Sequence, residues 1–184
     1  MFALTSANVV YRSENNGMTW RKLSDILERE ATTTLVKEQN EMGKVIRFEE
    51  SKADKSLIAL IGSQGVNWYS DDCGKTMRAL NHGRPIYEFQ FHPKKRDWGL
   101  AAAWTKCSDF QKTPCKIYKE LYLTKDLGKS WEFLTNYVVQ FSWAMSDLQS
   151  SVTRNFPAER IYVTRVANGE GHQKISGWSS DVDL

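Results

Sequence analysis

An eight-residue motif occurs three times in this chain of 184 residues. It reads SENNGMTW at Ser13 to Trp20, SDDCGKTM at Ser70 to Met77 and TKDLGKSW at Thr124 to Trp131. The glycines of the three copies are 57 and 54 residues apart, slightly more than the roughly 40–50 residues of a four-stranded propeller unit. The repeat therefore predicts an all-β chain, an arc of four-stranded antiparallel blades from a β-propeller.

Each position of the motif has a role in a hairpin turn. Asp or Asn accepts hydrogen bonds from nearby amides, Gly adopts positive φ, and Ser or Thr ties the two arms together. Because turn chemistry explains every position, the motif predicts architecture rather than ligand binding. Asn15 and Met77 depart from the pattern, so we expect looser hairpins there. The predicted structural residues of these repeat turns are Ser13, Asn15, Gly17, Thr19, Trp20, Ser70, Asp72, Gly74, Thr76, Met77, Thr124, Asp126, Gly128, Ser130 and Trp131.

Short β-rich runs flank each repeat turn, and two further runs precede the second and third turns. SLIALIG is apolar on both faces, as expected for a strand buried between two sheets. Only a short helical turn is predicted, near Ser24 to Arg29. We interpret residues 1–184 as one partial propeller domain. Its predicted divisions are the end of one blade (1–28), two whole blades (44–81 and 86–135) and the start of a fourth (137–184).

Composition narrows the function classes. A hydrophobic content of 41% with 26% charged residues is typical of a folded globular protein. The formal net charge of +3 is too small to indicate a nucleic-acid partner. The chain contains no long apolar run and no basic leader, so we predict neither a membrane span nor a signal peptide within it.

The residues do not form a recognisable catalytic or metal site. Asp71 and Asp72 are adjacent on a strand, so their side chains point to opposite faces, and the turn uses Asp72. His82, His92 and His172 are too dispersed for a metal site, and His92 is expected to be structural. We therefore predict no catalytic residue, no metal and no cofactor.

The cysteines leave two alternatives open. Cys107 and Cys115 flank a polar loop, and they form either a disulfide in a secretory compartment or two reduced thiols. Cys73 occupies a variable turn position and is expected to be an exposed, incidental thiol.

The tryptophans divide into two groups. We expect core positions for the four at repeat-related sites, which are Trp20, Trp98, Trp131 and Trp143. The positions of the other three, Trp68, Trp104 and Trp178, are not determined by the repeat.

The motif resembles the Asp-box, or bacterial neuraminidase repeat. Asp-boxes occur in sialidases, endoglucanases, a photosystem assembly factor and sortilin-type sorting receptors. FQFHPKKRDWGLAAAWTKC and the Cys-bounded segment that leads into TKDLGKSW resemble the sortilin family, and so does YVVQFSWA. The resemblance covers most of the chain and is strongest from Ile86 to Ala144.

The sortilin resemblance implies part of a ten-bladed propeller that binds protein or peptide cargo in the lumen of the Golgi and endosome. Such receptors add cysteine-rich modules, one membrane helix and a cytosolic tail, none of which occurs in this chain. The resemblance also implies a Cys107–Cys115 disulfide. No cargo-binding residue carries over, so the ligand-binding residues are unknown.

Two alternatives stand beside a non-enzymatic receptor segment. One is a glycoside hydrolase of the sialidase or xyloglucanase kind, but GRPI at Gly83 to Ile86 lies in the wrong context for the sialidase signature. The other is a propeller scaffold or assembly factor, which a reduced Cys107–Cys115 pair would favour.

Overall fold

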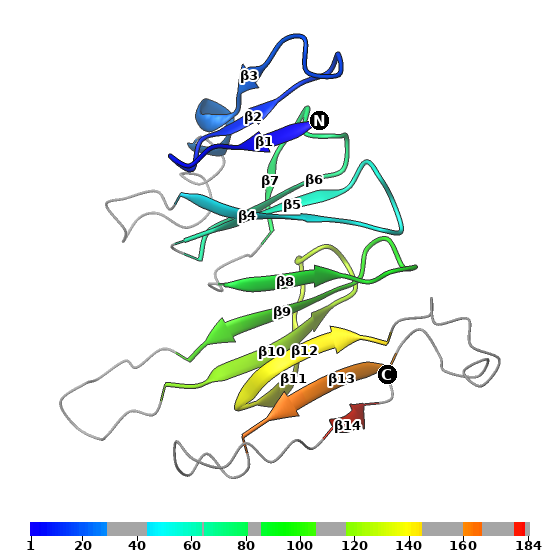
Figure 1. Cartoon of the computed structure of the whole chain (residues 1–184). Coiled ribbons are helices and arrows are strands. Elements are labelled where there is room, and N and C mark those ends of the chain that lie inside the picture. The colour runs from blue at the N-terminus through cyan, green and yellow to red at the C-terminus, as the bar shows by residue number, and fades with distance from the viewer. Residues whose placement is uncertain are drawn as a thin grey trace.

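In the residues that it describes, the computed structural model is nearly all β, with fourteen strands in four antiparallel sheets (Figure 1). It describes residues 1–28, 44–63, 65–80, 86–105, 117–144 and 160–166, together with the backbone of 179–182. The sheets follow one another in chain order from the top to the bottom of Figure 1.

Each sheet is built from consecutive strands of the chain. The first contains β1 (Phe2–Leu4), β2 (Val10–Arg12) and β3 (Arg21–Lys22), and residues 24–28, which follow it, are helical. The second contains β4 (Val45–Glu50), β5 (Ile58–Gly62), β6 (Asn67–Ser70) and β7 (Arg78–Ala79). The third contains β8 (Glu88–Phe91), β9 (Gly99–Trp104), β10 (Lys119–Thr124) and β11 (Glu132–Asn136). The fourth contains β12 (Val138–Trp143), β13 (Ile161–Arg165) and β14 (Ser179–Val182).

The predicted fold class is confirmed: the sheets are antiparallel, and the second and third have four strands. Sequence reasoning missed β1 and β14. These strands are three and four residues long, which is too short for their sequences to show an alternating apolar pattern.

Strand β5 is buried along its whole length because both of its faces pack on other sheets. Ile58 and Leu60 belong to a core that includes Val10 of the first sheet. Ala59 and Ile61 belong to a second core, shared with Phe89 of the third sheet. The two-sided apolar pattern of SLIALIG therefore has the predicted cause, a strand between two neighbouring sheets.

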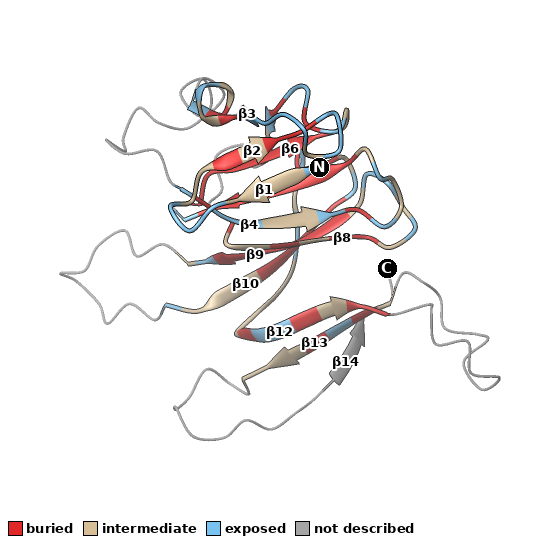
Figure 2. Ribbon diagram, turned by 45° about the horizontal axis from the view of Figure 1, so that its top comes forward, coloured by how far each residue is buried: buried red, intermediate tan, exposed pale blue. Residues whose placement is uncertain are grey.

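Strand β9 has the equivalent position in the third sheet. Ala101 faces the second sheet, whereas Leu100 and Ala102 join a third core with Phe141 and Trp143 of the fourth sheet. Figure 2 accordingly shows buried residues on strands of neighbouring sheets, such as β6 of the second sheet and β9 of the third. The hydrophobic cores are interfaces between sheets, so each sheet depends on its neighbours for stability.

Polar groups also connect neighbouring sheets. The indole Nε1 of buried Trp68 donates to the carbonyl of Leu27 at 3.1 Å. Buried Asn67 accepts from the amide of Gly62 at 2.9 Å and donates to the carbonyl of Ile86, on the segment leading to the third sheet, at 2.8 Å. These bonds satisfy groups whose burial would otherwise cost free energy.

The glycines of the second and third repeat turns touch the preceding sheet. All three turn glycines have positive φ, between 79° and 89°. A Cβ on Gly74 would lie 2.4 Å from the ring of Phe2, and one on Gly128 would lie 1.8 Å from the carbonyl oxygen of Leu80. A Cβ on Gly17 would meet only Trp20, at 3.6 Å. Glycine is thus required at the second and third turns by packing as well as by φ.

Replacing Gly128 should therefore cost more stability than replacing Gly17. Gly17→Ala adds backbone strain of about 1–2 kcal/mol. Gly128→Ala adds similar strain and a clash with backbone, for a total of about 3–5 kcal/mol. Urea unfolding followed by circular dichroism measures both variants. Equal losses would show that the contact with Leu80 does not matter.

Candidate functional site

The three repeat turns share one pattern of hydroxyl hydrogen bonds. In the first turn the Ser13 Oγ accepts from the Gly17 amide at 2.8 Å and donates to the Asn15 side chain at 3.1 Å. Ser70 in the second turn and Thr124 in the third make the equivalent pairs of bonds, at 2.7–2.8 Å. The hydroxyl group thus links the incoming strand to the glycine in each turn.

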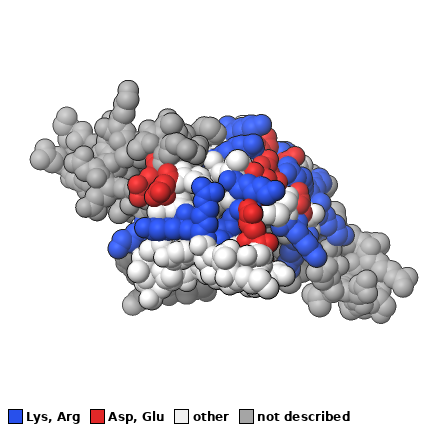
Figure 3. All heavy atoms as spheres, turned by 90° about the horizontal axis from the view of Figure 1, so that it is seen from above, with Lys and Arg blue, Asp and Glu red and all other residues white. Residues whose placement is uncertain are grey.

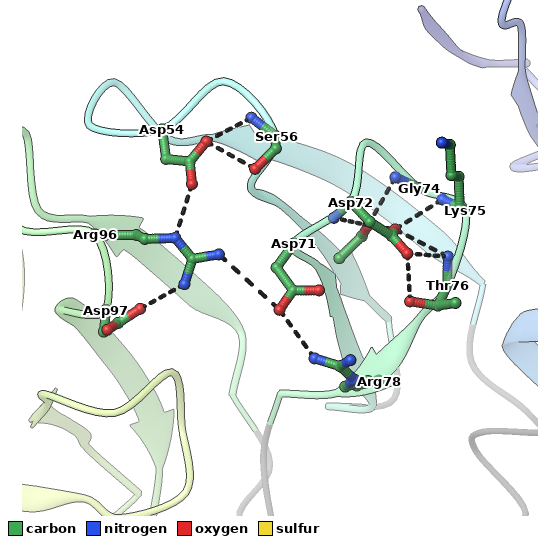
Figure 4. Close-up of polar contacts among 11 residues, drawn as sticks. Asp54, Ser56, Asp71, Asp72, Gly74, Lys75, Thr76, Arg78, Arg96 and Asp97 are labelled. Carbon is green, nitrogen blue, oxygen red and sulfur yellow. Dashed lines mark hydrogen bonds and ion pairs between the residues drawn. The ribbon is translucent and has the colours of Figure 1, made fainter.

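The carboxylates of Asp72 and Asp126 are saturated by donors from their own turns. Asp72 accepts from the Thr76 hydroxyl at 2.7 Å and from the Thr76 and Lys75 amides at 2.9 Å each (Figure 4). Asp126 accepts from the amide and hydroxyl of Ser130 at 2.9 and 2.5 Å. Burial would raise the pKa of Asp72, but these bonds outweigh it and lower the pKa to about 2. The pKa of Asp126 is lowered by the same balance of causes.

The two departures from the motif keep the turns well connected. Asn15 accepts from the Thr19 amide at 2.9 Å and donates its Nδ2 to the Thr19 hydroxyl at 2.9 Å, so the side-chain amide keeps both links to Thr19, with the hydroxyl now accepting. Met77 is buried in the core between the first and second sheets. Trp20, which we expected in the core, is instead 42% exposed, so that prediction was wrong.

Sequence reasoning missed a second left-handed residue in each turn. Asn16, Cys73 and Leu127, each directly before the glycine, have φ values of 54–58°. The Cys73 amide donates to the carbonyl of Ser56, and the Leu127 amide donates to the carbonyl of Asp97, both at 2.9 Å. This conformation aims the amide at the neighbouring hairpin of the same sheet. Asn adopts positive φ more readily than most residues, but it occupies this position only in the first turn, as Asn16. Cys73 and Leu127 give no such indication in the sequence.

A cluster of charged side chains joins the second and third sheets (Figure 4). Arg96, in the β8–β9 turn, donates to Asp54 of the β4–β5 turn at 2.7 Å and lies 4.0 Å from Asp71. Arg78 pairs with Asp71 at 2.9 Å. Hydrogen bonds from the hydroxyl and amide of Ser56, together with Arg96, lower the pKa of Asp54 to about 2. Asp71 therefore serves an ion-pair cluster between sheets.

The other residues named from the sequence divide into structural, exposed and undescribed ones. His92 is buried, its Nδ1 accepts two amide hydrogen bonds at 2.9 Å, and its ring packs edge-on against Trp143. Trp68 is fully buried, and Trp104 and the Cys73 thiol are exposed. Trp98 and Trp131 are partly buried against the cores. The residues that lie outside the described ranges are Cys107, Cys115, His82, His172 and Trp178.

A pocket of about 830 Å³ opens between the first and second sheets. Its lining includes Phe2 and Arg12 from the first sheet, and Lys52, Lys55 and Lys75 from two turns of the second. The Arg12 guanidinium pairs with Glu14 and donates to the Cys73 carbonyl at 2.6 Å. The lining thus combines an arginine held by two partners with three lysines.

The described residues offer neither a metal site nor a membrane-spanning helix. No group of three or more His, Cys, Asp and Glu side chains among them has an arrangement suited to a metal ion. No helix in the same ranges has the length and apolar character needed to cross a bilayer.

Replacing Asp72 with Asn should alter how stability depends on pH. Asp72 has a folded-state pKa of about 2 against an ordinary 3.8, so its stabilising effect is present above about pH 4 and lost as the pH falls towards 2. Asp72→Asn keeps most bonds, as Asn15 does, and should cost about 1 kcal/mol at neutral pH. Asp72→Ala should cost about 2 kcal/mol. Thermal unfolding from pH 7 to pH 2 measures the differences. A cost of Asp72→Asn that stays constant down to pH 2 would contradict the lowered pKa.

Comparison with solved structures places the sheet stack among β-propellers. An ancestral GH74 enzyme, a β-propeller protein, aligns with 89% of this chain and 20% of its own, with a TM-score of 0.51 and 15% identity. At this identity the likeness shows the fold alone.

Comparison with protein sequences identifies the family. Vacuolar protein sorting/targeting protein 10 of Ajellomyces capsulatus (strain H143) is 26% identical over 153 residues, which are 80% of this chain and 9% of that protein. The protein of the same name from Aspergillus terreus is 27% identical over 100 residues, 51% of this chain and 6% of that one. The chain thus spans less than a tenth of the length of these relatives. The Sortilin-Vps10 family model, described as "Sortilin, neurotensin receptor 3", matches residues 8–181, and the chain belongs to this family.

Proposed function

We propose that this chain is a non-enzymatic, protein-binding segment of a sorting receptor. It would act in the lumen on the route between the Golgi and the endosome or vacuole. The observation that carries the proposal is the match of the Sortilin-Vps10 model to residues 8–181. Curated relatives named for vacuolar protein sorting and targeting support it. The remaining blades of a ten-bladed propeller and the cysteine-rich modules would be its structural partners, and the Cys107–Cys115 disulfide remains a prediction.

The chemistry of the repeat turns supports a binding role over catalysis. Glycosidases use a pair of carboxyl groups, one of which carries a proton at working pH. Asp72 and Asp126 instead have lowered pKa values and bind donors of their own turns. We therefore propose that the turn residues stabilise the propeller and leave ligand contact to other surfaces.

Among the described carboxyl groups, that of Glu49 has a raised rather than a lowered pKa. Burial raises the pKa of Glu49 on β4, although Arg47 at 3.0 Å opposes the change. This ion pair gives Glu49 a structural partner on its own strand. The glycosidase alternative is not favoured, because the resemblance to the GH74 enzyme extends to the fold alone.

A chimeric receptor tests the proposal. Residues 8–181 would replace the matching segment of the Ajellomyces capsulatus relative, in cells that lack their own receptor. We expect the chimera to keep a vacuolar protein inside the cell, whereas receptor-deficient cells secrete it. Immunoblots of medium and cells measure the retained fraction.

The matched control is the same chimera with Gly128→Ala, which disturbs the contact between the second and third sheets. It should sort less cargo than the unaltered chimera. A chimera that leaves the endoplasmic reticulum normally and yet secretes as much cargo as receptor-deficient cells would contradict the proposed function.

A further inference from the structure

The pocket between the first and second sheets lies where the second repeat turn meets the β4–β5 turn. Its walls come from the start of β1, the end of β2, residues 50–52 and 55–58, and the turn residues Cys73 and Lys75. Its volume of about 830 Å³ lies within the range of sites that hold small ligands or short peptide segments. The two sheets thus form a recess of ligand size beside a turn that is fixed by its own hydrogen bonds.

The lining of this pocket has more positive than negative charge. Lys52, Lys55 and Lys75 line it, and within the described ranges their ammonium groups make no ion pair or hydrogen bond. Arg12 already pairs with Glu14, which leaves Glu50 as the other carboxylate in the lining against the three lysines. Figure 4 shows the Lys75 side chain extending away from Asp72, which binds only its backbone amide. The lysines are therefore available to an anionic partner.

The wall of the pocket is partly apolar, and the hydroxyls of two of its serines already take part in hydrogen bonds. Phe2 packs edge-on against Phe48, with ring centroids 6.0 Å apart, and the buried Leu57 also lines the pocket. The Ser51 hydroxyl accepts from the Asp54 amide, and the Ser56 hydroxyl donates to the Asp54 carboxylate. A bare phosphate would use the positive charge here but would leave the apolar part of the lining without a partner. A peptide with carboxylates and an apolar side chain matches both regions of the lining.

We propose that this pocket binds an acidic peptide segment whose carboxylates pair with Lys52, Lys55 and Lys75 and whose apolar side chain rests on Phe2. The inference rests on the proposed protein-binding function and adds the chemical class of one partner. The peptide binds at the junction of two sheets, on the side that carries the second repeat turn.

Fluorescence anisotropy of the full chain with a short labelled peptide of alternating glutamate and leucine tests the proposal. The pair Lys52→Glu and Lys55→Glu should weaken binding by about tenfold or more, because two attractions become repulsions. Binding should also weaken as salt is added. A peptide of alternating lysine and leucine should bind to the unaltered chain no better than background.

A control is needed because Lys and Arg are spread over much of the face above the first sheet, with Asp and Glu among them (Figure 3). Lys94→Glu with Lys129→Glu makes the same change in net charge at exposed sites outside the pocket. This pair should leave the affinity within about twofold, since distant exposed charges are screened. Circular dichroism confirms that each variant is folded.

Three results would overturn the proposal. They are equal weakening by the two lysine pairs, no binding of the acidic peptide by the folded chain, and tighter pocket-dependent binding of a sulfated oligosaccharide than of the peptide. The chimeric receptor separates this inference from the proposed function. Normal cargo sorting without peptide binding removes the pocket proposal alone, whereas peptide binding without sorting removes the receptor role alone.

Discussion

The structure depends on the burial of whole strands between neighbouring sheets. Strands β5 and β9 divide their side chains between two cores, so no sheet has an apolar interior of its own. Glycines of the second and third repeat turns add backbone-close contacts to the preceding sheet. In its second and third copies the repeat motif therefore forms a turn and also packs its glycine against the preceding sheet.

Much of this architecture could be predicted because the responsible interactions are local. The Ser13–Gly17 and Asp72–Thr76 bonds span four residues, so the motif encodes them directly. The two-sided burial of β5 follows from its continuous apolar run. The exposure of Trp20 and the left-handed φ of Cys73 and Leu127 depend on neighbouring hairpins and could not be read from composition. The Asp54–Arg96 pair joins residues 42 positions apart, and no local pattern announces it.

The candidate binding surface was less predictable than the fold. Lys52, Lys55 and Lys75 are ordinary turn residues in the sequence, and only the stacking of two sheets brings them around one pocket with Phe2. The carboxylates that stand out in the sequence prove to be occupied by turns and ion pairs. The conspicuous motif residues therefore maintain the scaffold, and the proposed binding surface is formed by less conspicuous residues that the stacking of sheets brings together.

Native-state hydrogen exchange of the three turn glycine amides shows most directly whether the repeat turns lock the sheets together. Each amide donates to the hydroxyl of its own turn, at 2.7–2.8 Å, so the local bond is the same in all three. They differ in contact with a preceding sheet, which Gly74 and Gly128 make and Gly17 does not. We expect Gly74 and Gly128 to exchange as slowly as β5 and β9, and Gly17 to exchange much faster. Equal rates at all three glycines would contradict a locking role for the repeat turns.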